Sequence, residues 1–129
     1  MIRSRPDAKV SGWLERQAKE SQFLSVVTVG ELRKGASNLP PGAKRTQIEQ
    51  AIEVLIPSWF VSRILPVTQA IAERWGILEA ERQLAGRPLS VPDGMIAATA
   101  SEHGLTVVTR NVKDFEGLGV TVLNPWEVW

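Results

Sequence analysis

The sequence contains no cysteine. This absence excludes disulfide bonds and thiolate metal sites, and it is consistent with a reducing compartment. No stretch is apolar for long enough to span a bilayer, and residues 1–5 are not followed by the apolar core of a signal peptide. We therefore expect a soluble, cytoplasmic protein without a membrane segment.

The chain also lacks a strong charge of either sign, since its formal net charge is +1. Without a general basic field, any contact with nucleic acid has to come from a local patch. The sequence has neither a P-loop nor a GxGxxG motif. Its only histidine is His103, and no serine stands in a nucleophile-elbow context, so the sequence does not indicate a Ser/His/Asp catalytic site. We interpret His103 as structural, because an imidazole in the last turn of a helix suits the helix dipole.

The amino acids that are present suit one globular domain over residues 1–129, with a hydrophobic fraction of 43%. Short apolar runs at 23–27, 63–67, 105–109 and 120–123 predict strands, and helical patterns stand between them. These runs are continuously apolar rather than alternating. Continuous runs favour a parallel sheet covered by helices, which places the chain in the α/β class.

The helical patterns have recognisable ends. Helices are expected at residues 7–18, 28–36, from 43 onward with a kink or break at Pro57, from a cap at Thr68 to Gly86, and at 93–103 before Gly104. The spacing Thr28-x-x-Glu31 matches a capping box at the start of the second of these helices.

Three acidic residues stand where the predicted elements change. Glu31 and Asp114 each follow a predicted strand, and Asp93 begins the helix that leads into the strand at 105–109. In parallel sheets, sites form outside the carboxyl ends of the strands. We therefore expect Glu31, Asp93 and Asp114 to lie together at one edge of the sheet.

Carboxylates gathered at one edge repel each other, and a hard divalent cation such as Mg²⁺ or Mn²⁺ offsets that repulsion. A metal held in this way lowers the pKa of a bound water and orients it towards a phosphodiester. Asn111 is a candidate neutral ligand, or a support for one of the acids. Arg110 and Lys113, which stand close by in the sequence, are candidates for binding phosphate. The pattern predicts a metal-dependent hydrolytic site.

Each of the three acids also has a purely structural interpretation. Glu31 would complete the capping box with Thr28. Asp93 would complement the helix dipole, which is worth ~0.3–1 kcal/mol at an exposed site. Asp114 would bind the backbone of its own turn.

Several segments together resemble the PIN-domain family, in its branch of VapC-type and FitB-like toxins of bacterial toxin–antitoxin pairs. The segments, in chain order, are RPDAKVSGWLERQ, FLSVVTVGELRKG, SRILPVT, VPDGMIAATA and GLTVVTRNVKDFEGLGVTVLNPWE. They cover nearly the whole chain. The resemblance implies a three-layer α/β/α fold with a parallel sheet. It also implies an Mg²⁺- or Mn²⁺-dependent endoribonuclease that hydrolyses RNA phosphodiester bonds.

Residue by residue, Glu31 matches the helix glutamate of the family and Asp93 matches its metal-binding aspartate. The fourth acidic position of the family falls in TRNVKDF, where Asn111 and Asp114 are both candidates, and Thr109 matches a hydroxyl that lines the site. The resemblance thus implies catalytic roles for Glu31, Asp93 and Asp114, which hold the metal together with Asn111. It also implies RNA as substrate, a cognate antitoxin as partner, and a homodimer.

The sequence departs from the family at its start. Family members begin with an apolar strand that ends in an Asp-Thr-Asn-like turn, whereas Met1 already lies beyond that point and Asp7 matches a helix start. We therefore expect the first strand and its metal aspartate to be missing. A start further upstream, a degraded gene product, and a fold closed by a partner or a rearranged sheet all explain this departure.

Three functions follow from these observations. The first is the metal-dependent ribonuclease toxin. The second is a catalytically degenerate module that only binds an antitoxin or another partner protein. The third is a receiver-like regulatory domain, which the sequence disfavours because it lacks the acidic pair at the end of a first strand.

Overall fold

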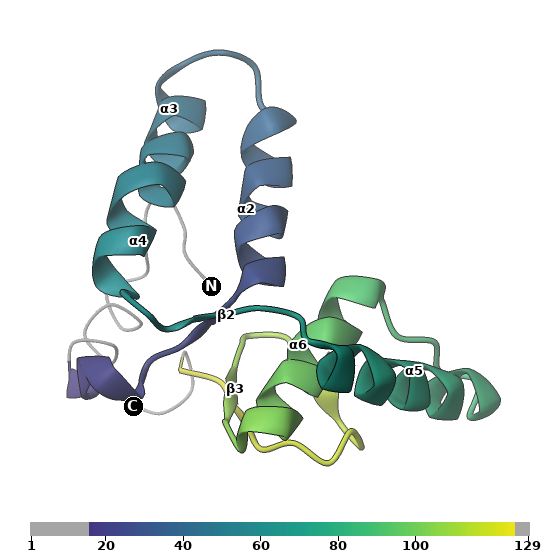
Figure 1. Ribbon diagram of the computed structural model, residues 1–129. Helices are drawn as coiled ribbons and strands as arrows, with labels where there is room; N and C mark the ends of the chain where they lie inside the picture. The colour runs from purple at the N-terminus through teal and green to yellow at the C-terminus, as the bar shows by residue number, and fades with distance from the viewer. Residues whose placement is uncertain (1–15, 126–129) are drawn as a thin grey trace. The chain divides into compact units, whose positions relative to one another are not determined.

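The computed structural model describes residues 16–125. The expected helix at 7–18 lies almost entirely outside this range. The prediction that the first strand is missing concerns the start of the chain, which also lies outside the described residues. The chain divides into two compact units, one ending at Leu65 and the other beginning at Pro66 (Figure 1). Each unit has a buried core of its own. This division does not test the expected single domain, which stays a prediction.

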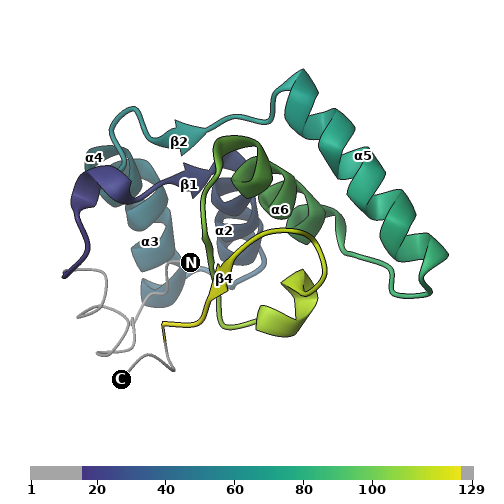
Figure 2. The same cartoon turned by 90° about the horizontal axis from the view of Figure 1, so that it is seen from below.

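The N-terminal unit is a helical hairpin with a pair of short strands. Its elements are η1 (Lys19–Ser21), β1 (Leu24–Ser25), α2 (Val26–Ser37), α3 (Ala43–Gln50), η2 (Ala51–Leu55), α4 (Ile56–Trp59) and β2 (Ile64–Leu65). Figure 2 shows β1 and β2 side by side. They pair in parallel, with Leu24 opposite Ile64. The two predicted strands and their parallel direction are confirmed, although each strand is shorter than its apolar run.

The sequence predicts a kink or break at Pro57, but the chain stays helical through this residue, and the π-helical segment η2 joins α3 to α4 just before it. Pro57 lies in the first turn of α4, where a backbone N–H would have no α-helical acceptor. The missing N–H of proline therefore costs little at this position. The N–H of Ile56 donates instead to the carbonyl of Ala51, which is the wide turn of a π-helix. This path places Ile52 and Ile56 in one core with Leu24 of β1.

The C-terminal unit contains two long helices and a second strand pair. Its elements are α5 (Gln69–Leu84), α6 (Val91–His103), β3 (Val107–Val108), η3 (Val112–Phe115) and β4 (Val122–Leu123). Strands β3 and β4 pair in parallel, with Val107 opposite Val122. Predicted parallel pairing is therefore confirmed here too. Between residues 16 and 125, no helix combines the length and the apolar character needed to cross a membrane.

Three of the predicted helix ends in this unit are confirmed. The hydroxyl of Thr68 accepts a hydrogen bond from the N–H of Ile71 at 3.2 Å and caps α5. Gly86 follows the end of α5 with φ +72°, and Gly104 ends α6 with φ +64°. Both glycines adopt the left-handed conformation that a side chain disfavours.

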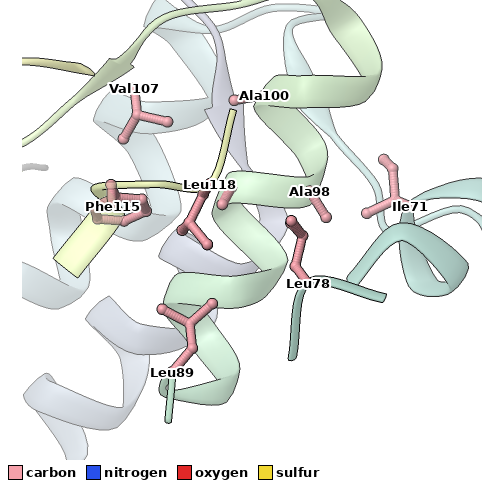
Figure 3. Close-up of a cluster of buried hydrophobic side chains, with 9 residues drawn as sticks. Ile71, Leu78, Leu89, Ala98, Ala100, Val107, Phe115 and Leu118 are labelled. Carbon is pink, nitrogen blue, oxygen red and sulfur yellow. The ribbon is translucent and has the colours of Figure 1, made fainter. Parts of the chain in front are cut away.

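The core of the C-terminal unit lies between α5, α6 and the chain that follows them. Figure 3 shows Ile71 and Leu78 of α5 facing α6, with Phe115 and Leu118 on another side of the same helix. All four are buried. The remaining buried members of this core are Leu89, Ala97, Ala98, Ala100 and Val107. Alanines on α6 let the neighbouring elements approach its backbone closely.

Gly94 lies at the tightest part of the α5–α6 contact. A Cβ at this position would lie 2.6 Å from Cδ1 and 2.8 Å from Nε1 of Trp75. The indole of Trp75 is partly buried and packs against the core, so it has little room to withdraw. Gly94 is therefore needed for packing, one residue after Asp93.

We predict that Gly94→Ala destabilises the protein by about 1–3 kcal/mol, the usual effect of overpacking. The matched control is Gly76→Ala, because Gly76 is also inside a helix but has open space around its Cβ position. That control should be neutral or stabilising by about 0.5–1 kcal/mol. Urea denaturation measures both, and equal stabilisation of the two variants would contradict the prediction.

Candidate metal centre

The predicted site residues are divided between the two units. The C-terminal unit contains Asp93 of α6, Asp114 of η3, and Asn111, which directly precedes η3. The N-terminal unit contains Glu31 of α2. Within either unit, no three histidine or acidic side chains among residues 16–125 gather into a group able to hold a metal ion. The complete centre of Glu31, Asp93, Asp114 and Asn111 therefore stays a prediction.

The expected helix start at Thr28 is wrong. Helix α2 begins at Val26, because the extended residue Ser25 places its hydroxyl to accept the N–H of Val27 at 3.1 Å. The β-branched run FLSVV had suggested strand up to Val27, and the cap at Ser25 overrides that propensity. Thr28 is thus inside the helix. The capping-box interpretation of Glu31 is wrong as well, and Glu31 is an exposed residue further along α2.

The expected helix start at Asp93 is also wrong. Helix α6 begins at Val91, and the hydroxyl of Ser90 accepts the N–H of Asp93 at 3.3 Å. The pattern Ser90-x-x-Asp93, with Pro92 in the first turn, is a capping-box spacing that could have identified this start. Asp93 is half-buried in the first turn of α6. Its charge lies at the positive end of the helix dipole, as its structural interpretation requires.

The capping box at α6 is only half formed. The side chain of Ser90 caps the helix, but no group among residues 16–125 donates a hydrogen bond to the carboxylate of Asp93 or forms an ion pair with it. Its two oxygens are thus available to a ligand, and the dipole supplies part of the charge compensation.

Asp114 lies in η3, a single 3₁₀ turn after β3. The hydroxyl of Thr109 accepts the N–H of Asn111 at 3.1 Å, and the carbonyl of Asn111 accepts the N–H of Asp114 at 3.1 Å. These bonds close the turn. Across the described part of the chain, the exposed carboxylate of Asp114 accepts no hydrogen bond from the backbone. The turn-binding role that would explain Asp114 structurally is therefore filled by Thr109 and Asn111.

Two buried side chains hold η3 against α6. Phe115 is 3% exposed and Leu118 is 5% exposed, and both belong to the core that contains Ala97 and Ala98 of α6 (Figure 3). Asp114 directly precedes Phe115, so burial of the phenyl ring fixes the chain beside Asp114. Asp93 and Asp114 thus belong to two elements that pack on each other.

The donor set suits a hard divalent cation. Asp93 and Asp114 offer carboxylate oxygens, and Asn111 offers an amide oxygen, which are the ligands that Mg²⁺ and Mn²⁺ prefer. His103 lies at the other end of α6, in the last turn, where it was expected.

The α/β fold with parallel strands agrees with the comparisons with known proteins. The family model of the PIN domain matches residues 1–119. The chain belongs to the PIN-domain family, as its sequence segments predicted.

Its relatives include VapC proteins. VapC ribonuclease Y4jK of Sinorhizobium fredii is 35% identical over 125 residues, covering 97% of this chain and 89% of the relative. A crystal structure of FitAcB from Neisseria gonorrhoeae has a TM-score of 0.86 and 36% identity, covering 98% of this chain and 91% of that chain. A toxin–antitoxin complex from Klebsiella pneumoniae has a TM-score of 0.69 and 32% identity, covering 95% and 88%.

The corrected start of α2 leads to a stability prediction. Ser25→Ala should destabilise the protein by about 1 kcal/mol, because it removes the side chain that caps the helix. Thr28→Val removes a hydroxyl from inside the helix, and valine has nearly the same shape as threonine. This substitution should change stability by less than about 0.5 kcal/mol. Thermal unfolding of both variants measures the difference. A larger loss for Thr28→Val would restore the original helix start and the capping role of Glu31.

Proposed function

We propose that the protein is a metal-dependent endoribonuclease toxin of a toxin–antitoxin pair. The observation that carries the proposal is that, among residues 16–125, no protein group binds the carboxylate of Asp93 or that of Asp114. Asp93 lies at the positive end of α6, where the helix dipole favours a negative charge, and Thr109 helps to close the turn of Asp114. Two carboxylates that keep their oxygens available, on elements that pack on each other, are consistent with a site for a hard cation.

Similarity to known proteins supports the same class. VapC ribonuclease Y4jK is a relative over nearly the whole chain. The proposed substrate is therefore RNA, and the proposed ligands of the metal are Glu31, Asp93, Asp114 and Asn111. Glu31 belongs to this set by its match to the family pattern, and the other three also share one unit.

The roles of the chain's own groups follow from their chemistry. The carboxylates of Glu31, Asp93 and Asp114 would hold Mg²⁺ or Mn²⁺, and the amide of Asn111 would add a neutral ligand. When bound, the metal would activate a water and neutralise charge that develops on the phosphate. Lys113 is exposed in η3, where its ammonium is available to bind the RNA backbone.

The proposed partner is a small antitoxin protein. The likeness to a toxin–antitoxin complex from Klebsiella pneumoniae supports this assignment. An antitoxin that covers the acids would compete with metal and RNA for them, which makes binding and inhibition a single event. We also propose a homodimer, as the resemblance to the toxin family implies.

A module that binds an antitoxin without catalysis is the second candidate. The observation that favours it is that neither unit gathers three acids into a metal-binding group within residues 16–125. Antitoxin capture together with complete absence of metal-dependent cleavage would establish this alternative.

The first test of the proposed function neutralises Asp93. Asp93→Asn should lower Mn²⁺-dependent cleavage of RNA by about 100-fold or more. Removing a group that only supports a metal ligand costs about 10- to 100-fold, so the loss of a ligand itself should be at least as large. The matched control is Glu102→Gln, since Glu102 is an exposed acid of the same helix that pairs with Arg74 at 3.3 Å. Cleavage of a labelled RNA, with and without EDTA, measures the effect. Equal activity of both variants would remove Asp93 from the site.

A second test decides between Asn111 and Asp114. If Asn111 is a ligand, Asn111→Asp adds a negative charge to the site and should tighten Mn²⁺ binding, whereas Asp114→Asn should weaken it only if Asp114 is a ligand. Isothermal titration with Mn²⁺ measures both affinities. Unchanged affinity in either variant excludes that residue from the metal's own ligands.

A further inference from the structure

Arg82, in the last turn of α5, contacts three backbone carbonyls. Its Nε donates a hydrogen bond to the carbonyl of Arg87 at 2.7 Å. Its Nη1 donates to the carbonyls of Asp114 and Glu116, both at 3.4 Å. One guanidinium thus joins the chain that follows α5 to the chain that contains a proposed metal ligand.

These carbonyls are suitable partners for a cation. Asp114 and Glu116 lie at the end of η3, and the last carbonyls of a helix have no helical N–H to accept. These carbonyls carry the partial negative charge of the helix end, so a positive charge close to them is favourable. Arg82 as a residue is half-buried, and the three bonds that its guanidinium donates lie at the surface of the protein.

The geometry also depends on arginine itself. A guanidinium is planar and presents its donors as a rigid fork, so it bridges separate acceptors with little loss of freedom. A lysine at this position has a single ammonium at the end of a flexible stem and would not hold both segments in the same way.

We propose that Arg82 is a positioning residue for the metal centre. It fixes η3, and therefore Asn111 and Asp114, against the C-terminal end of α5. Phe115 and Leu118 already anchor this segment to α6 through burial. Arg82 adds a directional contact at the backbone of Asp114 itself, and it leaves the carboxylate of that residue available. This inference rests on the proposed function.

The test compares Arg82→Met with Arg74→Met in the full-length chain. Methionine retains an apolar stem in each case and removes only the guanidinium. Arg74 is the matched control, because it lies on the same helix and donates a comparable bond to Glu102 at 3.3 Å, away from η3. Amide hydrogen exchange followed by mass spectrometry reports on the segment 111–117.

In Arg82→Met we expect exchange in this segment to accelerate by about tenfold, the factor for losing one hydrogen bond to a charged group. The Mn²⁺ concentration for half-maximal RNA cleavage should rise by about 10-fold or more. Arg82→Lys should recover only part of either effect, and Arg74→Met should show neither.

Three outcomes are informative. Equal exchange of the segment in Arg82→Met and Arg74→Met would overturn the positioning role. Faster exchange with an unchanged Mn²⁺ requirement would also overturn it, since Arg82 would then be merely structural. If the unmodified chain neither binds Mn²⁺ nor cleaves RNA, the proposed function fails. Exchange in the segment then decides by itself whether Arg82 fixes η3.

Discussion

The close contact between α5 and α6 is the constraint on which the C-terminal unit depends. Trp75 of α5 fills the space over Gly94, so that helix α6 is held with its N-terminus close to α5. Asp93 stands directly before Gly94, and its backbone position is fixed by the same contact. Further along α5, in its last turn, Arg82 donates to the carbonyls of Asp114 and Glu116. Both proposed metal-site segments of this unit are thus placed by one helix.

Prediction of the fold from sequence succeeded where the determinants are local. Thr68, Gly86 and Gly104 set helix ends through bonds and φ angles within a few residues, and all three were found from the sequence. Parallel strands followed from continuously apolar runs. Ser25 and Ser90 were missed because a strand-like run and a proline hid the caps. The role of the acids Glu31, Asp93 and Asp114 in a metal site stays a prediction, and the observed contacts bear only on their structural interpretations.

Other features could not be derived from sequence patterns. Pairing of β1 with β2 extends over two residues on each strand, although the apolar runs are longer, because pairing depends on how far two segments stay parallel in space. The contact of Arg82 with Asp114 joins residues 32 positions apart. No periodicity predicts such a contact, since it exists only after α5, α6 and η3 have packed together.

The way in which the chain uses its charges explains how acids can stay available. Its exposed ion pairs, such as Arg74–Glu102 and Arg33–Glu53, use other carboxylates. Such surface pairs contribute only about 0–1 kcal/mol, so leaving Asp93 and Asp114 out of them forgoes little stability. Arg82 would weaken the site if it bound the carboxylate of Asp114, because it would compete with a metal for the same oxygens. By binding main-chain carbonyls it orders the turn without neutralising the side chain. Rigid backbone and an uncompensated carboxylate are then compatible, which is the condition that a hard-metal centre requires.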